Sequence, residues 1–244
     1  MPQLLAIDTS SAWCSVALSL GDQAPILRHE PVSTGASQLL LPWIDELLRA
    51  ANLQLSDLDA IAVDVGPGAF TGVRLGVAAV QGLATAASLP VLPVASLDAI
   101  AAQVVETAKF SKANPANFVV AIDARMDEIY WAKYQTTMSN QLPVRVGEIA
   151  LSKPENIDLV GIQYLAGSAI SAYQERLFTN ITLPVDVCDE DIGISALGVL
   201  SCARTMLGLG KAISVHHLEP LYVRNKVALT TEERQIAFGK GLDS

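Results

Sequence analysis

The first hundred residues alternate between short apolar runs, typical of strands, and longer segments in which apolar residues recur at helical spacing. Ser37 and Ser96 stand before two such helical segments and are expected to cap them. The predicted strands are 4–7, 14–20, 24–32, 60–65 and 91–94, and the predicted helices are 37–52, 71–88 and 96–109. This order of elements, β-β-β-α-β-α-β-α, indicates an α/β unit.

The second half of the chain repeats the beginning of the first. Ala6-Ile7-Asp8 recurs as Ala121-Ile122-Asp123 after a polar, proline-containing stretch at 111–117, which is predicted as a linker. The further predicted elements are strands at 118–125, 128–135, 143–151 and 159–166, and a helix at 196–207. We interpret this pattern as an internal duplication. The alternative is that two α/β units share a common tripeptide by chance.

Composition limits the possible classes of protein. Of the 244 residues, 51% are hydrophobic and 17% are charged, which suits a buried core and excludes extensive disorder. The net charge of −9 disfavours strong binding of nucleic acid by the chain alone. The uncharged run 75–97 contains Pro90 and Pro93, so it predicts a buried helix and strand rather than a membrane span. Three dispersed cysteines and the lack of a signal peptide pattern predict a cytoplasmic protein.

A glycine-rich turn follows the apolar strand predicted at 60–65. Gly66-Pro67-Gly68 leads into the helix expected from Thr71. Backbone N–H groups at such a helix start bind anions, and phosphate in particular. The same turn is also an ordinary connection between a strand and a helix, in which glycine only allows the tight bend. The local sequence leaves both interpretations open.

Four segments of the chain resemble one known family. They are Leu5-Ala-Ile-Asp-Thr-Ser10, Leu40-Leu-Pro-Trp-Ile-Asp-Glu-Leu-Leu48, Gly66-Pro-Gly-Ala-Phe-Thr-Gly-Val-Arg-Leu-Gly76 and Pro220-Leu-Tyr-Val-Arg-Asn-Lys226. Together they resemble the TsaB family, the bacterial partners of the tRNA threonylcarbamoyl transferase TsaD. The resemblance implies a duplicated actin-like ATPase fold with two βββαβα-type subdomains. We expect one subdomain at 1–110, a degenerate second one at 117–215, and a C-terminal segment at 216–244 that packs back and ends in a disordered tail.

The same resemblance implies a function. TsaB-like proteins are non-catalytic and act with TsaD and TsaE, which transfer threonylcarbamoyl to N6 of the adenosine beside the anticodon. The resemblance thus implies TsaD and TsaE as partners, with tRNA bound only as part of the complex. It also implies that ATP and a metal belong to the partner proteins, with no cofactor in this chain. A homodimer of the isolated chain is possible. The alternative function is a small-molecule kinase or ATPase of the actin-like fold.

The residues themselves argue against chemistry in this chain. A nucleotide site of the actin-like type needs glycines in a second phosphate loop, and the chain has Ala124-Arg-Met-Asp127 there. The HxxxH metal pair of TsaD relatives corresponds to Ser96 and Ile100. We therefore predict no catalytic residue and no metal site. The weak candidates that remain for an anion loop are Asp8, Thr9, Ser10, Gly66 and Gly68.

A partner surface on two helices is the favoured alternative. Small residues at helical spacing let another helix approach closely, and Trp43 is of a type enriched in interface anchors. The predicted interface residues are Leu40, Trp43, Ile44, Leu47, Gly72, Val73, Arg74, Gly76, Val77 and Val80. The competing interpretation is that these side chains pack on the chain's own sheet. The basic segment 222–226 is expected either to contact a partner or tRNA, or to pack back across the chain.

Overall fold

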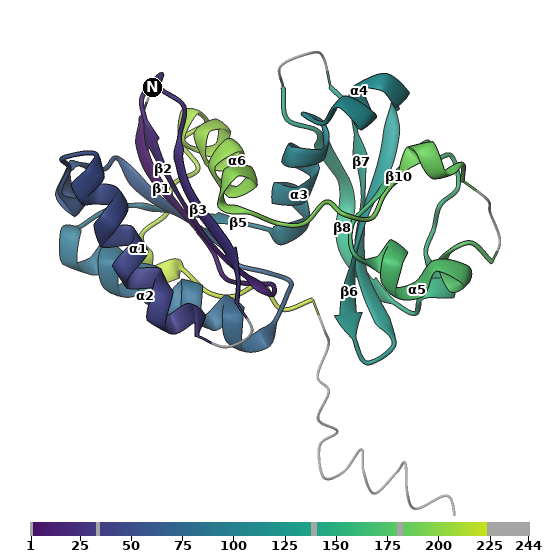
Figure 1. Ribbon diagram of the computed structural model, residues 1–244, viewed down its shortest axis with the longest axis horizontal. Coiled ribbons are helices and arrows are strands. Elements are labelled where there is room, and N and C mark those ends of the chain that lie inside the picture. The colour runs from purple at the N-terminus through teal and green to yellow at the C-terminus, as the bar shows by residue number, and fades with distance from the viewer. Residues whose placement is uncertain (1, 33–34, 138–140, 180–182, 224–244) are drawn as a thin grey trace, which may run out of the picture.

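A computed structural model describes residues 2–32, 35–137, 141–179 and 183–223 of the chain. It contains two five-stranded mixed sheets with helices on their faces (Figure 1). Among the described residues, no helix combines the length and the apolar character that a membrane span requires.

The central strand of the first sheet is the first element of the chain, and it is almost entirely buried. Its strands are β1 (Gln3–Asp8), β2 (Trp13–Leu20), β3 (Ile26–Pro31), β4 (Ala60–Asp64) and β5 (Val91–Val94). They lie in the order β3-β2-β1-β4-β5, with β1 antiparallel to β2 and parallel to β4. Because β1, β4 and β5 run in the same direction, their carboxyl ends meet at one edge of the sheet.

The second sheet repeats this arrangement. Its strands are β6 (Asn117–Arg125), β7 (Glu128–Gln135), β8 (Val144–Ser152), β9 (Tyr164–Ala166) and β10 (Cys188–Asp189). Their order is β8-β7-β6-β9-β10, again with one antiparallel and one parallel neighbour for the central strand. Asp8 ends β1 and Asp123 lies two residues before the end of β6, and the two accept equivalent bonds, from the N–H of Ser10 and of Arg125 at 2.8 Å each. The predicted duplication is therefore confirmed.

Six α-helices cover the sheets. They are α1 (Ala36–Ala50), α2 (Phe70–Ala87), α3 (Ser96–Val104), α4 (Ala108–Ala113), α5 (Ala169–Leu177) and α6 (Ala196–Gly208) among the described residues. The helices α1 and α2 cover one face of the first sheet, and α6 covers its other face (Figure 1). The helix α3 lies between α6 and the second sheet, whose far face carries α5. Short 3₁₀ turns at 55–57, 154–156, 185–187 and 215–217 complete the chain.

The helix α6 follows the second sheet in sequence but packs on the first. Its first N–H, that of Ala196, donates to Ser15 Oγ of β2 at 2.8 Å. Between α3 and the second sheet, Tyr134 of β7 donates its hydroxyl to Asp98 of α3 at 2.8 Å. One apolar cluster runs from β1 through α6 and α3 to β6 and β7. The boundaries 1–110 and 117–215 stay a prediction, and α6 belongs spatially with the first sheet.

Several local predictions are wrong. Gly35 precedes the first residue of α1, and Ser37 lies inside the helix, which continues through Pro42. The helix expected to reach residue 109 ends at Val104, because Thr107 caps a separate helix by accepting the N–H of Phe110. Residues 159–163 form a turn ahead of β9 rather than part of the strand. In each case a local capping or turn contact overrides the hydrophobic spacing.

The C-terminal segment crosses back to the first sheet, as far as residue 223. Leu218 is buried among the residues of α1, α2 and β4, and its carbonyl accepts a bond from Gln81 of α2 at 2.9 Å. The N–H of Leu221 donates to Val65 O at 2.8 Å. Arg224 and Lys226 of the basic segment, and the expected disordered tail, lie outside the described residues.

Candidate functional site

The candidate site is the edge of the first sheet where β1 and β4 end and α2 begins. Asp8 ends β1, Thr9 and Ser10 follow it, and all three residues are buried. The turn Gly66-Pro67-Gly68 follows β4 and leads into α2, and the peptide bond before Pro67 is cis. The structure thus brings together the five residues predicted as an anion loop.

The first turn of α2 is bonded directly to the loop after β1. The Thr9 hydroxyl donates to Gly72 O at 2.7 Å, and the N–H of Ala69 donates to Ser10 O at 2.6 Å. A Cβ on Gly72 would lie 1.9 Å from Thr9 O, and one on Gly68 would lie 2.5 Å from Ser10 O. Both distances are far below van der Waals contact, so glycine is required for the helix to approach this closely.

This contact decides what the two glycines do. In a phosphate-binding loop, glycine lets the backbone approach the ligand, whereas Gly68 and Gly72 let α2 approach the chain's own loop. The hydroxyl of Thr9 and the carbonyl of Ser10 already have partners within the protein. The glycine pattern of this turn is explained by packing inside the chain.

A buried pair of carboxyl groups lies beneath this loop. Asp8 ends β1 and Asp64 ends β4, and burial of both side chains is almost complete. Asp64 Oδ1 accepts the N–H of Gly66 at 3.0 Å, and Ser96 Oγ lies 2.8 Å and 2.9 Å from the two Asp64 oxygens. One oxygen of Asp8, Oδ2, has no hydrogen-bond partner among the described residues.

Burial raises the pKa of both carboxyl groups. Loss of hydration is the main cause for Asp8 and Asp64, and the neighbouring Asp8 charge raises the pKa of Asp64 further. The pair therefore retains a proton at a pH where exposed aspartates are ionised. The sequence pattern singled out Asp8 but missed Asp64 and Ser96 as its neighbours. The available signal was that Asp64, like Asp8, ends an apolar run at the same sheet edge.

The turn after β6 is the structural counterpart of the loop after β1, and an arginine of α5 binds to it. Three consecutive residues, Arg125, Met126 and Asp127, have positive φ angles of 60°, 55° and 65°. Arg176 of α5 bonds to Asp127 and to Glu155. Glycine is absent at the three positions where left-handed backbone geometry favours it most.

The positions that match the TsaD metal pair have other contacts. Ser96 bonds to Asp64, and Ile100 is buried in the apolar cluster around α3 and α6. His29, one of three histidines, stacks on Trp13 with ring centroids 4.5 Å apart. No group of three or more His, Cys, Asp or Glu side chains that would suit a metal ion occurs within the described ranges.

The predicted interface residues on α1 and α2 lie mainly in the chain's own core. Burial of the side chain or Cα is nearly complete for Leu40, Trp43, Ile44, Leu47, Val73, Gly76, Val77 and Val80. Gly72 packs on Thr9, so of the ten residues only it and Arg74 keep intermediate exposure. The apolar spacing that predicted a partner surface therefore marks the inward face of the two helices, which is buried within the chain. The role of these residues in a partner interface stays a prediction.

The outward faces of α1 and α2 carry a different set of residues. Leu41 of α1 and Phe70 of α2 are large exposed apolar side chains. Ala78 and Gly82 are exposed small residues farther along α2, and the space beside Gly82 is open. A partner that docks on these helices would contact this face. Such an interface stays a prediction.

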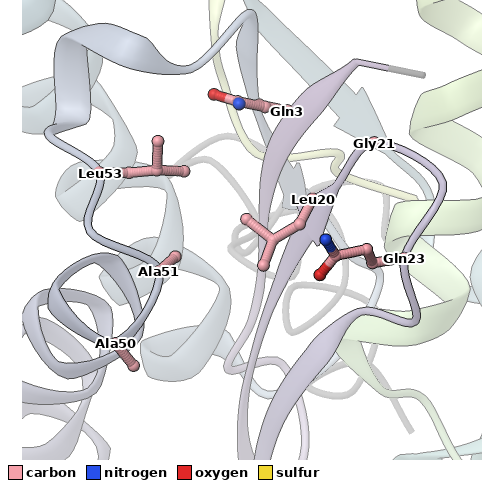
Figure 2. Close-up of a pocket in the computed structure, with 7 residues that line it drawn as sticks. All are labelled: Gln3, Leu20, Gly21, Gln23, Ala50, Ala51 and Leu53. Atoms are coloured by element: carbon pink, nitrogen blue, oxygen red, sulfur yellow. The ribbon is translucent and has the colours of Figure 1, made fainter.

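A cavity of about 440 Å³ lies at the opposite end of the first sheet (Figure 2). It is formed where α1 ends, β1 begins and β2 turns into β3. Its lining residues are Gln3, Leu20, Gly21, Gln23, Ala50, Ala51 and Leu53. None of these side chains can act as an acid, a base or a nucleophile, so the lining of this cavity offers no catalytic group.

Comparison with known proteins assigns the chain to a family. The family model described as "TsaD: tRNA N6-adenosine threonylcarbamoyltransferase" matches residues 30–237. The chain is 34% identical to the tRNA threonylcarbamoyladenosine biosynthesis protein TsaB of Escherichia coli K12, across 93% of this chain and 96% of that protein. The chain belongs to the TsaB family. The TsaB of Haemophilus influenzae is also 34% identical, across 92% of this chain and 94% of that protein.

Solved structures agree with the TsaB assignment. An uncharacterized Pseudomonas aeruginosa protein, described as similar to the peptidase YeaZ, superposes with a TM-score of 0.79 and 36% identity. The match covers 92% of this chain and all of that one. A second structure, YeaZ from the same organism, gives a TM-score of 0.77 and 36% identity. The predicted family and the α/β actin-like fold class are both confirmed.

The close approach of α2 to the loop after β1 predicts a large difference between two glycines of one helix. Gly72→Ala should lower the free energy of unfolding by about 3 kcal/mol or more, because its Cβ meets a backbone carbonyl that cannot move aside. Gly82→Ala should be neutral or stabilise by up to about 1 kcal/mol, since alanine favours helix and the space there is open. Urea unfolding of both variants measures the difference; equal stability would contradict the contact.

The buried pair predicts a characteristic dependence of stability on pH. Both carboxyl groups have a pKa raised in the folded state, so the folded chain binds more protons and loses stability as pH rises above the ordinary value of 3.8. Asp64→Asn keeps an acceptor for Gly66 and removes one titrating group. Its stability relative to the wild type should therefore increase with pH, by at most about 1.4 kcal/mol per pH unit.

The control for this prediction is Asp191→Asn, which removes one exposed carboxylate. Urea unfolding of the three proteins between pH 4 and pH 8 gives the comparison. A difference between Asp64→Asn and the wild type that does not change with pH would show that Asp64 titrates normally.

Proposed function

We propose that the chain is a non-catalytic subunit that binds and stabilises a TsaD-type transferase. In that complex, with TsaE, threonylcarbamoyl passes to N6 of the adenosine beside the anticodon in tRNA. The observation that carries the proposal is the similarity to TsaB along nearly the whole of both chains. The TsaB relatives are named as tRNA threonylcarbamoyladenosine biosynthesis proteins.

The closed loop supports the non-catalytic part of the proposal. A nucleotide-dependent transferase needs backbone and hydroxyl groups that are free to bind phosphate. In this chain the Thr9 hydroxyl and the Ala69 N–H already donate to carbonyl groups of the protein, and the turn after Asp123 has no glycine. We therefore assign ATP and the metal ion to the partner proteins.

Charge supports an indirect role in tRNA binding. A net charge of −9 repels the phosphate backbone, so tRNA would be held mainly by the other subunits of the complex. The proposed role implies that the protein acts in the cytoplasm, where tRNA is modified. The isolated chain would expose the outer face of α1 and α2, which is also available for pairing with a second copy.

Reconstitution tests the proposal. Unmodified tRNA is incubated with TsaD, TsaE, ATP and threonylcarbamoyl adenylate, with and without this chain, and its nucleosides are analysed by mass spectrometry. We expect threonylcarbamoyladenosine only when this chain is present, and none from this chain alone. Equal modification without the chain would contradict the proposal.

A pair of variants tests the proposed docking face. Ala78→Asp places a charge on the exposed face of α2, and Val160→Asp places the same charge on an exposed position of the second half. We expect Ala78→Asp to weaken binding to TsaD at least about tenfold, because a charge buried at an interface loses its hydration. Val160→Asp should bind like the wild type. Equal binding of both variants would place the interface elsewhere.

A further inference from the structure

Two segments 148 residues apart form an exposed cluster at the start of α2. The Arg74 guanidinium lies 3.2 Å from the centre of the Phe70 ring and 5.1 Å from that of Tyr222. It donates to Phe70 O at 3.0 Å and to the Tyr222 hydroxyl at 2.6 Å. We call Phe70, Arg74 and Tyr222 the aromatic–arginine cluster.

The rings of this cluster are unusually exposed for aromatic side chains. Phe70 is 70% exposed, Tyr222 is 63% exposed, and Leu221, which precedes Tyr222, is 39% exposed. Isolated apolar side chains on a surface need no explanation, but two exposed rings that contact the same guanidinium indicate an interaction site. Tyr, Phe and Arg are also the residue types enriched in interface cores.

The cluster is ordered before any partner arrives. Two hydrogen bonds and the stacked ring hold the Arg74 side chain, so binding would cost little of the rotamer entropy that arginine usually loses. The backbone of Tyr222 is positioned through its neighbour Leu221, whose N–H donates to the carbonyl of Val65, directly after β4. The C-terminal segment is therefore part of the surface.

The charge of the cluster indicates the chemistry of its partner. A guanidinium has five N–H donors, and two hydrogen bonds are assigned to Arg74. Within the described parts of the chain, no carboxylate forms an ion pair with it. An unpaired cation between two aromatic rings, in a chain with net charge −9, is complementary to a carboxylate surrounded by apolar groups.

We propose that the aromatic–arginine cluster is the anchor by which this chain docks a protein partner that presents an acidic side chain in an apolar patch. The proposal rests on the proposed function, which makes that partner the TsaD-type transferase. It adds that the C-terminal segment supplies half of the anchor through Tyr222. It also places the strongest contacts at the start of α2 rather than along its buried small-residue face.

Calorimetric titration with purified TsaD tests the anchor. Arg74→Glu should raise the dissociation constant at least about a hundredfold, because it reverses the charge that the partner's carboxylate meets. Phe70→Ala should raise the dissociation constant at least about tenfold, as truncation of an interface anchor does. Lys211→Glu makes the same charge change at an exposed position and should alter binding less than about threefold. Thermal unfolding checks that each variant is folded.

Each other outcome has a defined meaning. If the wild type does not bind TsaD, the proposed function and the anchor both fail. If the wild type binds and Arg74→Glu binds equally well, the anchor alone is wrong. If Arg74→Glu loses only self-association, or keeps TsaD but the complex loses tRNA, the occupant is a second copy or RNA, and the proposal is overturned.

Discussion

The approach of α2 to the loop after β1 is the constraint on which the rest of this structure depends. Gly72 lies against the carbonyl of Thr9, so closely that no side chain fits between them. This contact fixes where α2 begins and brings Phe70 and Arg74 to the surface beside the C-terminal segment. It also engages the Thr9 hydroxyl and the Ala69 N–H, two donors of the kind that bind phosphate. One packing contact thus closes a possible ligand loop and builds a possible docking surface.

The buried carboxyl pair depends on the same closure. Asp8 and Asp64 end neighbouring parallel strands, which places two carboxyl groups together where little water can reach them. Burial raises the pKa of both, and Ser96 and the N–H of Gly66 supply hydrogen bonds to Asp64. A raised pKa favours the neutral carboxyl, and a neutral carboxyl costs less to bury than a carboxylate.

The fold could be predicted from the sequence further than the site. Apolar runs and the repeated Ala-Ile-Asp tripeptide predicted every described strand of the two sheets except the two-residue β10, because strand burial depends mainly on local pattern. The spacing of Gly72, Gly76 and Val77 correctly indicated a close contact, but spacing cannot tell a partner from the chain's own loop. The pairing of Asp8 with Asp64, and of Arg74 with Tyr222, joins residues distant in sequence and follows only from the folded topology.

The central claim is that α2 closes the loop at which an actin-like ATPase would hold its nucleotide. Isothermal titration of the isolated chain with ATP and magnesium tests this claim most directly. The account predicts no saturable binding tighter than about 1 mM, the weak end of usual substrate affinities. Saturable binding in the micromolar range, with one nucleotide per chain, would contradict it.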